Sequence, residues 1–199
     1  MADRSWEFVF LARHGQTEWN RVRRRQGQLD SPLTAAGIAQ AHRGAATLRG
    51  HGVDYVFSSP LGRATATARI FADHTEAPLL VIDELAEVHH GRFAGLTDDD
   101  IDAAYPGELA RRAQDKYRWT FPAGESYADA DRRAARALAR IAAHPARRPL
   151  IVSHEMIGRM LQRHLLGLDP AEALRRRHPH DAVYAINPAE HTWRELRTR

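Results

Sequence analysis

The sequence predicts an α/β protein with three α/β/α layers around a mainly parallel central sheet. Short apolar runs of strand length recur along the chain, and segments with the apolar spacing of helices separate them. Because these runs do not alternate with polar residues, we expect strands covered on both faces, as in parallel sheets flanked by helices. A chain of 199 residues, 43% of them hydrophobic, is long enough for one sizeable core, so a single domain over residues 1–199 is expected.

The expected strands are four core runs and two shorter segments near the end of the chain. Residues 182–186 and 192–196 are expected to add a final hairpin at one edge of the sheet. The four core runs are FVFLA (8–12), VDYVFS (53–58), LLVI (79–82) and PLIVS (149–153).

The expected helices have recognisable ends. Ser59 is the expected N-cap of the second helix, with Pro60 at its first position. Ser126 and Asp129 have the spacing of a capping box ahead of the third helix. Gly167 ends the fourth helix. The four helices are expected at residues 34–49, 60–73, 127–143 and 155–166.

Composition narrows the class of protein. The net charge of +4 rests almost wholly on arginines dispersed among acids, and Lys116 is the only lysine, so a nucleic-acid partner is not expected. No apolar run approaches the roughly 20 residues that span a bilayer, and residues 1–7 do not resemble a signal peptide, which favours a cytoplasmic protein with no membrane partner. The absence of cysteine excludes disulfides and thiolate catalysis. The sequence leaves a homodimer open.

Basic and imidazole side chains follow three of the apolar runs, where each expected strand ends. Arg13 and His14 close the first run, and His154 follows the fourth. Arg63 falls in the first turn of the helix after the second run. Ligands of open α/β sheets bind at the carboxyl ends of the strands, where helix N-termini also present free N–H groups. These residues therefore predict a crevice that holds a phosphate group.

An ordered set of motifs identifies a family. Taken together, the motifs make the chain similar to the histidine phosphatase superfamily, in its phosphoglycerate mutase-like branch, and the resemblance implies that branch's three-layer fold. The motifs are ARHGQTEWN (12–20), QGQLDSPLTAAGIAQA (26–41), SSPLGRATATA (58–68), DELAEVHHGRFAGLT (83–97), PAGES (122–126) and IVSH (151–154).

The resemblance implies a role for each residue of the crevice. His14 matches the nucleophile, Arg13, Arg63 and His154 surround the phosphate, and Glu87 matches the proton donor. Arginine forks suit the charged phosphoryl oxygens, and a neutral imidazole can attack phosphorus to form a phosphohistidine. A carboxyl group can then protonate the leaving oxygen. These steps require no metal and no cofactor.

Three further residues are expected on the substrate side of the pocket, and one assignment stays open. Asn20 matches a phosphate ligand, with a capping or turn role as the alternative, and Gln26 and Gly27 match positions that line the pocket. Glu84 lies three residues before Glu87 and could exchange roles with it, one acid being structural and the other the proton donor.

The expected activity is hydrolysis of a small phosphorylated metabolite. Cofactor-dependent mutases of the family carry a much longer segment than the one here between Glu87 and Gly124, and a shorter segment leaves the pocket open to water. A phosphoglycerate mutase and a phosphate-binding regulatory module of low turnover are the alternatives.

Several features have less specific meanings. The pairs His89–His90 and HPH (178–180) resemble metal ligands, but they lack carboxylates at a defined spacing, so no metal is expected. The arginines of residues 21–26 could receive a second anionic group of the substrate or belong to a solvated loop. Tyr105, Trp119 and Phe121 are expected to pack in the core or to stack on substrate.

Glu155 departs from the family pattern, because relatives usually have glycine after the second histidine. A carboxylate in the first turn of a helix is favourable by itself. The alternative hypothesis is that Glu155 edges the pocket and repels substrates that carry a second anionic group.

Overall fold

The central sheet of the computed structural model, which describes residues 6–196, has six strands in the order β3-β2-β4-β1-β5-β6. The strands β1, β4, β2 and β3 run parallel, whereas β5 is antiparallel to both β1 and β6. The mainly parallel sheet and its edge hairpin are thereby confirmed. The strands are β1 (Val9–Arg13), β2 (Tyr55–Ser58), β3 (Leu79–Val81), β4 (Pro149–Ser153), β5 (Val183–Asn187) and β6 (Thr192–Leu196).

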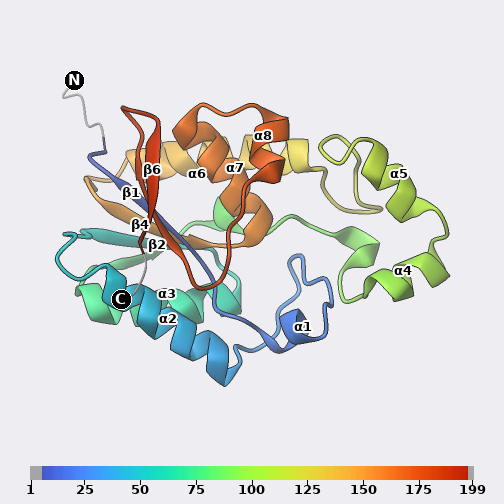
Figure 1. Ribbon diagram of the computed structural model, residues 1–199, viewed down its shortest axis with the longest axis horizontal. Helices are drawn as coiled ribbons and strands as arrows, with labels where there is room; N and C mark the ends of the chain where they lie inside the picture. Colours follow the sequence, from blue (N-terminus) through green and yellow to red (C-terminus); the bar gives the residue numbers. More distant parts are fainter. Residues whose placement is uncertain (1–5, 197–199) are drawn as a thin grey trace.

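Helices cover both faces of this sheet, as Figure 1 shows. The helices α2 (Ala35–Thr47) and α3 (Gly62–Thr75) lie on one face. The other face carries α6 (Tyr127–Ala142), α7 (Glu155–Leu166) and α8 (Pro170–Arg175). None of the helices within residues 6–196 has the length and apolar character needed to cross a membrane.

The apolar runs are unalternating because each face of the sheet has its own core. In β1, Leu11 belongs to the hydrophobic cluster that includes α6 and α7, whereas Phe10 belongs to the cluster that includes α2 and α3. Consecutive residues of one strand are thus buried on opposite faces. The edge strand β3 differs, because Val81 is 49% exposed. The expectation of burial on both faces is wrong there, since β3 pairs only with β2.

The observed ends of the helices agree with those expected from the sequence, except for the start of α3. The capping box of Ser126 and Asp129 begins α6, and Gly167 ends α7 with a left-handed φ of 66°. The expected start of α3 is wrong: its N-cap is Leu61, and Ser59 makes a different contact, with His154. The Ser59 hydroxyl thus contacts the candidate site, and it also accepts from the backbone N–H of Leu61 at 3.3 Å, just before α3 begins.

The segment between β3 and α6 forms short helices beside the α/β layers (Figure 1). Its helices are α4 (Asp98–Ala104) and α5 (Glu108–Gln114), and we refer to residues 94–121 as the α4–α5 segment. Trp119 packs with its ring centroid 5.6 Å from Phe93 and 4.9 Å from Phe121. Tyr105 also packs on Phe93, at 5.3 Å. These aromatic rings therefore form the core of the segment, which is the packing role left open above.

The loop after β1 is fixed by a close approach to α2. A Cβ atom on Gly15 would lie 2.2 Å from the carbonyl oxygen of Gly37, and one on Gly37 would lie 2.1 Å from that of Gln16. Only glycine at both positions allows the two backbones to touch. The first turn of α2 thereby supports the short helix α1 (Glu18–Arg21) and the residues that follow β1.

Candidate active site

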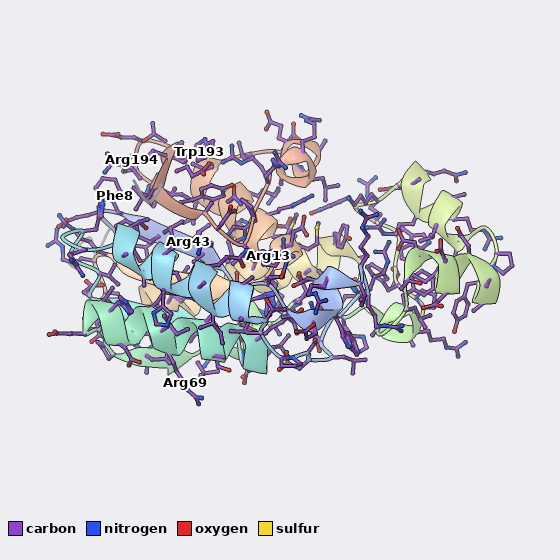
Figure 2. The ribbon with its side chains drawn as sticks, turned by 60° about the horizontal axis from the view of Figure 1, so that its bottom comes forward. Phe8, Arg13, Arg43, Arg69, Trp193 and Arg194 are labelled. Carbon is purple, nitrogen blue, oxygen red and sulfur yellow. The ribbon has the colours of Figure 1, made fainter. Side chains whose placement is uncertain are left out.

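A cavity of about 290 Å³ lies at the carboxyl ends of β1 and β4, between the sheet and the α4–α5 segment. Figure 2 shows Arg13, the last residue of β1, in the middle of the molecule. His154 is fully buried and does not line the cavity, and its ring centroid lies 5.1 Å from that of His14. The other seven predicted site residues all line the cavity: Arg13, His14, Asn20, Gln26, Gly27, Arg63 and Glu87.

The ring of His14 has one defined tautomer. Its Nδ1 lies 2.7 Å from the carbonyl oxygen of Gly15, which can only accept, and its Nε2 receives a hydrogen bond from Nε of Arg63 at 3.3 Å. Nδ1 therefore carries the proton, and Nε2 is unprotonated, with its electron pair accepting from Arg63. Burial is the main reason that the pKa of His14 lies well below its usual value, and the nearby His154 ring and Arg13 guanidinium add to the effect. The imidazole is neutral, which is the nucleophilic form.

Arg63 is held from three sides although it belongs to the first turn of a helix. Its NH2 donates to the carbonyl of Gly27 and its NH1 to that of Leu29, both at 2.7 Å. Asp30 accepts from NH1 at 3.0 Å and also from the Arg63 backbone N–H at 3.3 Å. A solvated helix arginine would have none of these contacts. Gly27 lines the cavity and also orients Arg63 through its carbonyl.

Arg13 and Glu155 form an ion pair at the edge of the cavity. NH1 of Arg13 lies 3.2 Å from the Glu155 carboxylate and donates to the carbonyl of His178 at 3.2 Å. The second carboxylate oxygen of Glu155 lies 2.5 Å from Arg159. Glu155 therefore edges the pocket as hypothesised, but two guanidinium groups compensate its charge. Within the described residues, Nε of Arg13 is buried without a partner.

His154 makes its contacts behind the cavity wall. Its Nε2 lies 2.7 Å from Oγ of Ser59, and its Nδ1 is buried without a hydrogen-bond partner among residues 6–196. Burial is the main reason that its pKa lies well below the usual value, and the charge of Arg63 adds to the effect. His154 is therefore also a neutral ring, in contact with the ring of His14.

The carboxylate of Glu87 lies at the N-terminus of α7. The backbone N–H groups of Val88, Met156 and Ile157 donate to its oxygens at 2.9–3.1 Å. Arg133 fixes the chain that carries Glu87, because it donates to the backbone carbonyls of Glu84, Ala86 and Glu87. Glu87 is buried, and its carboxylate is fixed at the cavity wall.

Glu84 and Glu125 have structural contacts instead. The Glu84 carboxylate lies 2.6 Å from Arg140 and is not among the residues that line the cavity. Glu125, from the PAGES motif, pairs with Arg133 at 2.7 Å. Of the two acids left open by the sequence, Glu87 is the one beside His14 in the cavity, and the PAGES motif supports its loop through Arg133.

Asn20 and Gln26 line the cavity in different ways. Oδ1 of Asn20 accepts from the backbone N–H and the hydroxyl of Thr17 at 3.0 Å, which completes the capping box of α1. The capping alternative for Asn20 is therefore present, and any hydrogen bond to a ligand would come from Nδ2. Oε1 of Gln26 is buried without a partner among the described residues.

The HPH motif supports the site, a role that the sequence reasoning missed. Nδ1 of His180 lies 2.6 Å from the carbonyl oxygen of His14, and Nδ1 of His178 lies 3.2 Å from that of His154. The ring of His178 lies so close to α7 that a Cβ atom on Gly158 would meet it at 1.9 Å. The two histidines around Pro179 resemble metal ligands by their spacing, but each ring contacts a backbone carbonyl. Within residues 6–196, no group of three or more His, Asp or Glu residues could hold a metal ion.

Comparisons with known proteins identify the family of the chain. The family model described as the histidine phosphatase superfamily (branch 1) matches residues 9–199. A relative named "Probable phosphoglycerate mutase GpmB", from Yersinia pestis (strain Pestoides F), is 42% identical over 172 residues, which cover 84% of this chain and 78% of the relative.

Solved structures with the same fold include phosphatases. The alpha-ribazole phosphatase from Shigella flexneri matches with a TM-score of 0.84 and 27% identity, over 96% of this chain and 95% of that one. The mycobacterial glucosyl-3-phosphoglycerate phosphatase in complex with VO3 matches with a TM-score of 0.81 and 29% identity, over 96% and 98%. The chain is therefore an enzyme of the phosphatase and mutase class, and it belongs to branch 1 of the histidine phosphatase superfamily.

Proposed function

We propose that the protein is a metal-independent phosphomonoesterase that acts on small phosphorylated metabolites through a phosphohistidine on His14. The observation that carries the proposal is the neutral His14 ring, whose Nε2 electron pair lies beside Arg63 in the wall of the cavity. Arg13 and Arg63 supply positive charge for the phosphoryl oxygens, so the reaction as proposed needs no metal ion.

In the first step, Nε2 of His14 attacks phosphorus and the bond from phosphorus to the ester oxygen breaks. The leaving oxygen takes a proton from Glu87, which acts as the general acid in this step. In the second step, the Glu87 carboxylate accepts a proton from water, the water oxygen attacks phosphorus, and the N–P bond breaks. Inorganic phosphate leaves, and His14 is neutral again.

Phosphoglycerate mutase activity is the second candidate, because the relative at 42% identity carries that name. Hydrolysis is favoured by the short chain between Glu87 and Gly124, whose two α-helices, α4 and α5, have seven residues each. Two similar solved structures are phosphatases by name. A mutase would convert 3-phosphoglycerate into its 2-isomer faster than it releases phosphate, whereas we expect phosphate release to dominate.

The covalent step can be tested directly. Rapid quenching during turnover of a 32P-labelled ester should trap an acid-labile, alkali-stable phosphate on the protein, and His14→Ala should remove both the label and nearly all turnover. A regulatory module would bind phosphate without forming the label. If the His14→Ala variant still turns over or still becomes labelled, the assignment of the nucleophile is wrong.

The metal-independence is tested with a chelator. Phosphate release should persist in excess chelator, and orthovanadate should inhibit because it adopts the five-coordinate geometry of the transition state. Activity that is lost in chelator and restored by a divalent metal would overturn this part of the proposal. We further propose that the enzyme works in the cytoplasm as a single domain.

A further inference from the structure

The walls of the cavity carry far more positive charge than one phosphate group requires. Two acids, Glu87 and Glu155, stand among the charged residues of the lining. A monoester dianion on Arg13 and Arg63 would account for two of the cations, which leaves six. The eight cationic lining residues are Arg13, Arg23, Arg24, Arg25, Arg63, Arg112, Lys116 and Arg159.

Three of the remaining cations are already paired with carboxylates. Arg25 pairs with Asp98 at 2.6 Å and Arg24 with Asp100 at 3.7 Å, so these arginines dock the loop after α1 on the first turn of α4. Arg159 pairs with Glu155, as described above. Arg24 and Arg25, two of the arginines in residues 21–26 that could receive a second anionic group, are therefore already paired with carboxylates of the protein.

The other three cations, Arg23, Arg112 and Lys116, form no salt bridge within residues 6–196. Arg23 is exposed, whereas Arg112 and Lys116 are partly buried. Both face Tyr127, which is buried: the guanidinium carbon of Arg112 lies 5.5 Å and the ammonium of Lys116 lies 6.0 Å from the centre of its ring. NH2 of Arg112 donates to the Tyr127 hydroxyl at 2.6 Å, which fixes the guanidinium group. Two cations four residues apart therefore converge on one aromatic ring without an acid between them.

Unpartnered polar atoms lie around the same part of the cavity. Among the described residues, Nε of Arg112 and both ring nitrogens of His90 are buried without hydrogen-bond partners. The His90 ring stacks on Phe121 at 4.5 Å and lines the cavity. Buried polar groups are normally paired, so these atoms indicate a polar group that binds there. Burial and the charge of Arg112 also lower the pKa of Lys116, a repulsion that an anion would relieve.

We propose that Arg112 and Lys116 form a second anion subsite, so that the substrate is a small phosphomonoester with a further carboxylate or phosphate group. This inference rests on the proposed phosphatase function of the same cavity. The scissile phosphate binds at His14 on the sheet side, and the second acidic group binds at the α4–α5 segment on the opposite side. A neutral sugar phosphate or aryl phosphate leaves Arg112 and Lys116 without a counter-charge.

The experiment compares kcat/KM for two pairs of phosphate esters. Glycerol 3-phosphate and 3-phosphoglycerate share a three-carbon chain and differ by a carboxylate, and glucose 6-phosphate and glucose 1,6-bisphosphate differ by a second phosphate. The wild-type enzyme should prefer the member with two acidic groups in one pair at least, and the pair identifies the second group. In Lys116→Gln this preference should fall about 10- to 100-fold, the usual value of a hydrogen bond to a charged group.

The matched control removes the same charge from the same segment, outside the cavity. Arg118 is exposed, and its partner is Asp115 at 3.8 Å. Arg118→Gln should therefore leave the preference unchanged, and Lys116→Arg should restore most of it. Thermal unfolding of each variant shows whether it is folded. The ratio of kcat/KM within one pair of esters does not depend on the fraction of active enzyme, so a change in this ratio reports the subsite and not misfolding.

The possible failures are distinguishable. Hydrolysis of both members with equal kcat/KM, or a preference that Lys116→Gln does not change, would overturn the subsite and leave the phosphatase in place. No hydrolysis of any ester, with no label on His14, would overturn the proposed function itself.

Discussion

The two sides of the cavity hold their charged groups in opposite ways. On the sheet side, Arg63 makes hydrogen bonds to two backbone carbonyls and to Asp30, and the backbone carbonyl of His14 is held by His180. On the side of the α4–α5 segment, Arg112 and Lys116 contact an aromatic ring and no acid among the described residues. We infer that the sheet side is preorganised for one reaction, whereas the cations of the α4–α5 segment are available to pair with an anionic group of the substrate.

The difference also follows from where the residues lie in the chain. The sheet-side groups stand at the ends of buried strands, which the two cores fix from both faces. Arg112 and Lys116 belong to a seven-residue helix and the turn after it, outside the sheet. Substitutions on the sheet side should therefore lower the rate for every substrate, and those on the segment should alter the preference among substrates.

The largest effect is expected for Glu87→Gln, which removes the proton donor and keeps the shape of the side chain. Turnover of glycerol 3-phosphate should fall by about 10²–10⁴-fold, the usual contribution of a general acid, because its alkoxide is a poor leaving group. Turnover of p-nitrophenyl phosphate should fall much less, since nitrophenolate leaves without a proton. The measurement is kcat for the two esters.

Glu84→Gln is the control for this prediction. Glu84 pairs with the half-exposed Arg140, so turnover should change by less than about twofold. A large loss in Glu84→Gln with little change in Glu87→Gln would assign the proton donor to Glu84 instead.

The motif residues around His14 were predictable because they are local to strand ends. Arg13, His14 and His154 follow apolar runs that could be recognised from the sequence, and parallel strands bring their carboxyl ends to one edge. Contacts between distant segments could not be predicted in this way. Ser59 has every local feature of an N-cap, yet its hydroxyl meets a histidine 95 residues later in the chain.

Residues of the α4–α5 segment were harder to place for a related reason. The arginines at 24 and 25 pair with the acids at 98 and 100 only because the loop after α1 meets the first turn of α4, a contact that no periodicity reveals. Arg112 and Lys116 belong to a segment whose side chains follow no sheet. The HPH motif was visible in the sequence, but its hydrogen bonds to the carbonyls of the two site histidines depend on the antiparallel strand β5 returning beside β1.

The next largest effect concerns stability at low pH. Burial lowers the pKa of His178 to about 3, so the folded protein binds its proton far less readily than the unfolded chain does. The unfolded state binds more protons between pH 6.5 and about pH 3, and stability therefore falls as the pH decreases through this range. At pH 5 the loss from one such histidine is about 2 kcal/mol relative to pH 8.

His178→Asn tests this contribution, because an asparagine can still donate to the carbonyl of His154 but does not titrate. The free energy of unfolding, measured in urea at pH 8 and pH 5, should decrease by about 2 kcal/mol less in the variant than in the wild type. Equal decreases in the two proteins would mean that His178 is not protonated on unfolding.

A smaller effect is expected for His180→Ala, which frees the backbone carbonyl of His14. We expect kcat to fall about tenfold, the value of one well-placed hydrogen bond, with KM nearly unchanged, because the nucleophile loses its position and the phosphate ligands remain. His180→Asn should recover much of kcat, since its amide can donate to the same carbonyl. The same loss in kcat for every ester, with KM nearly unchanged, would agree with a role on the sheet side.

His191→Ala is the matched control for His180. The ring of His191 also lies against a backbone carbonyl, that of Leu165 at 3.3 Å, at the far end of α7. Its loss should leave kcat unchanged. If His191→Ala and His180→Ala lower kcat equally, the loss reflects general destabilisation and not the position of His14.

The smallest effect is expected for Glu155, which lies between the two sides. If its carboxylate repelled a second anionic group, Glu155→Gln would raise kcat/KM selectively for 3-phosphoglycerate over glycerol 3-phosphate. Because Arg13 and Arg159 compensate its charge, we expect instead a decrease of about two- to threefold for both esters, as Arg13 loses one partner and keeps the carbonyl of His178. A selective gain that shrinks in added salt would show that Glu155 acts on the substrate, and the charges that decide the preference would then extend to the sheet side.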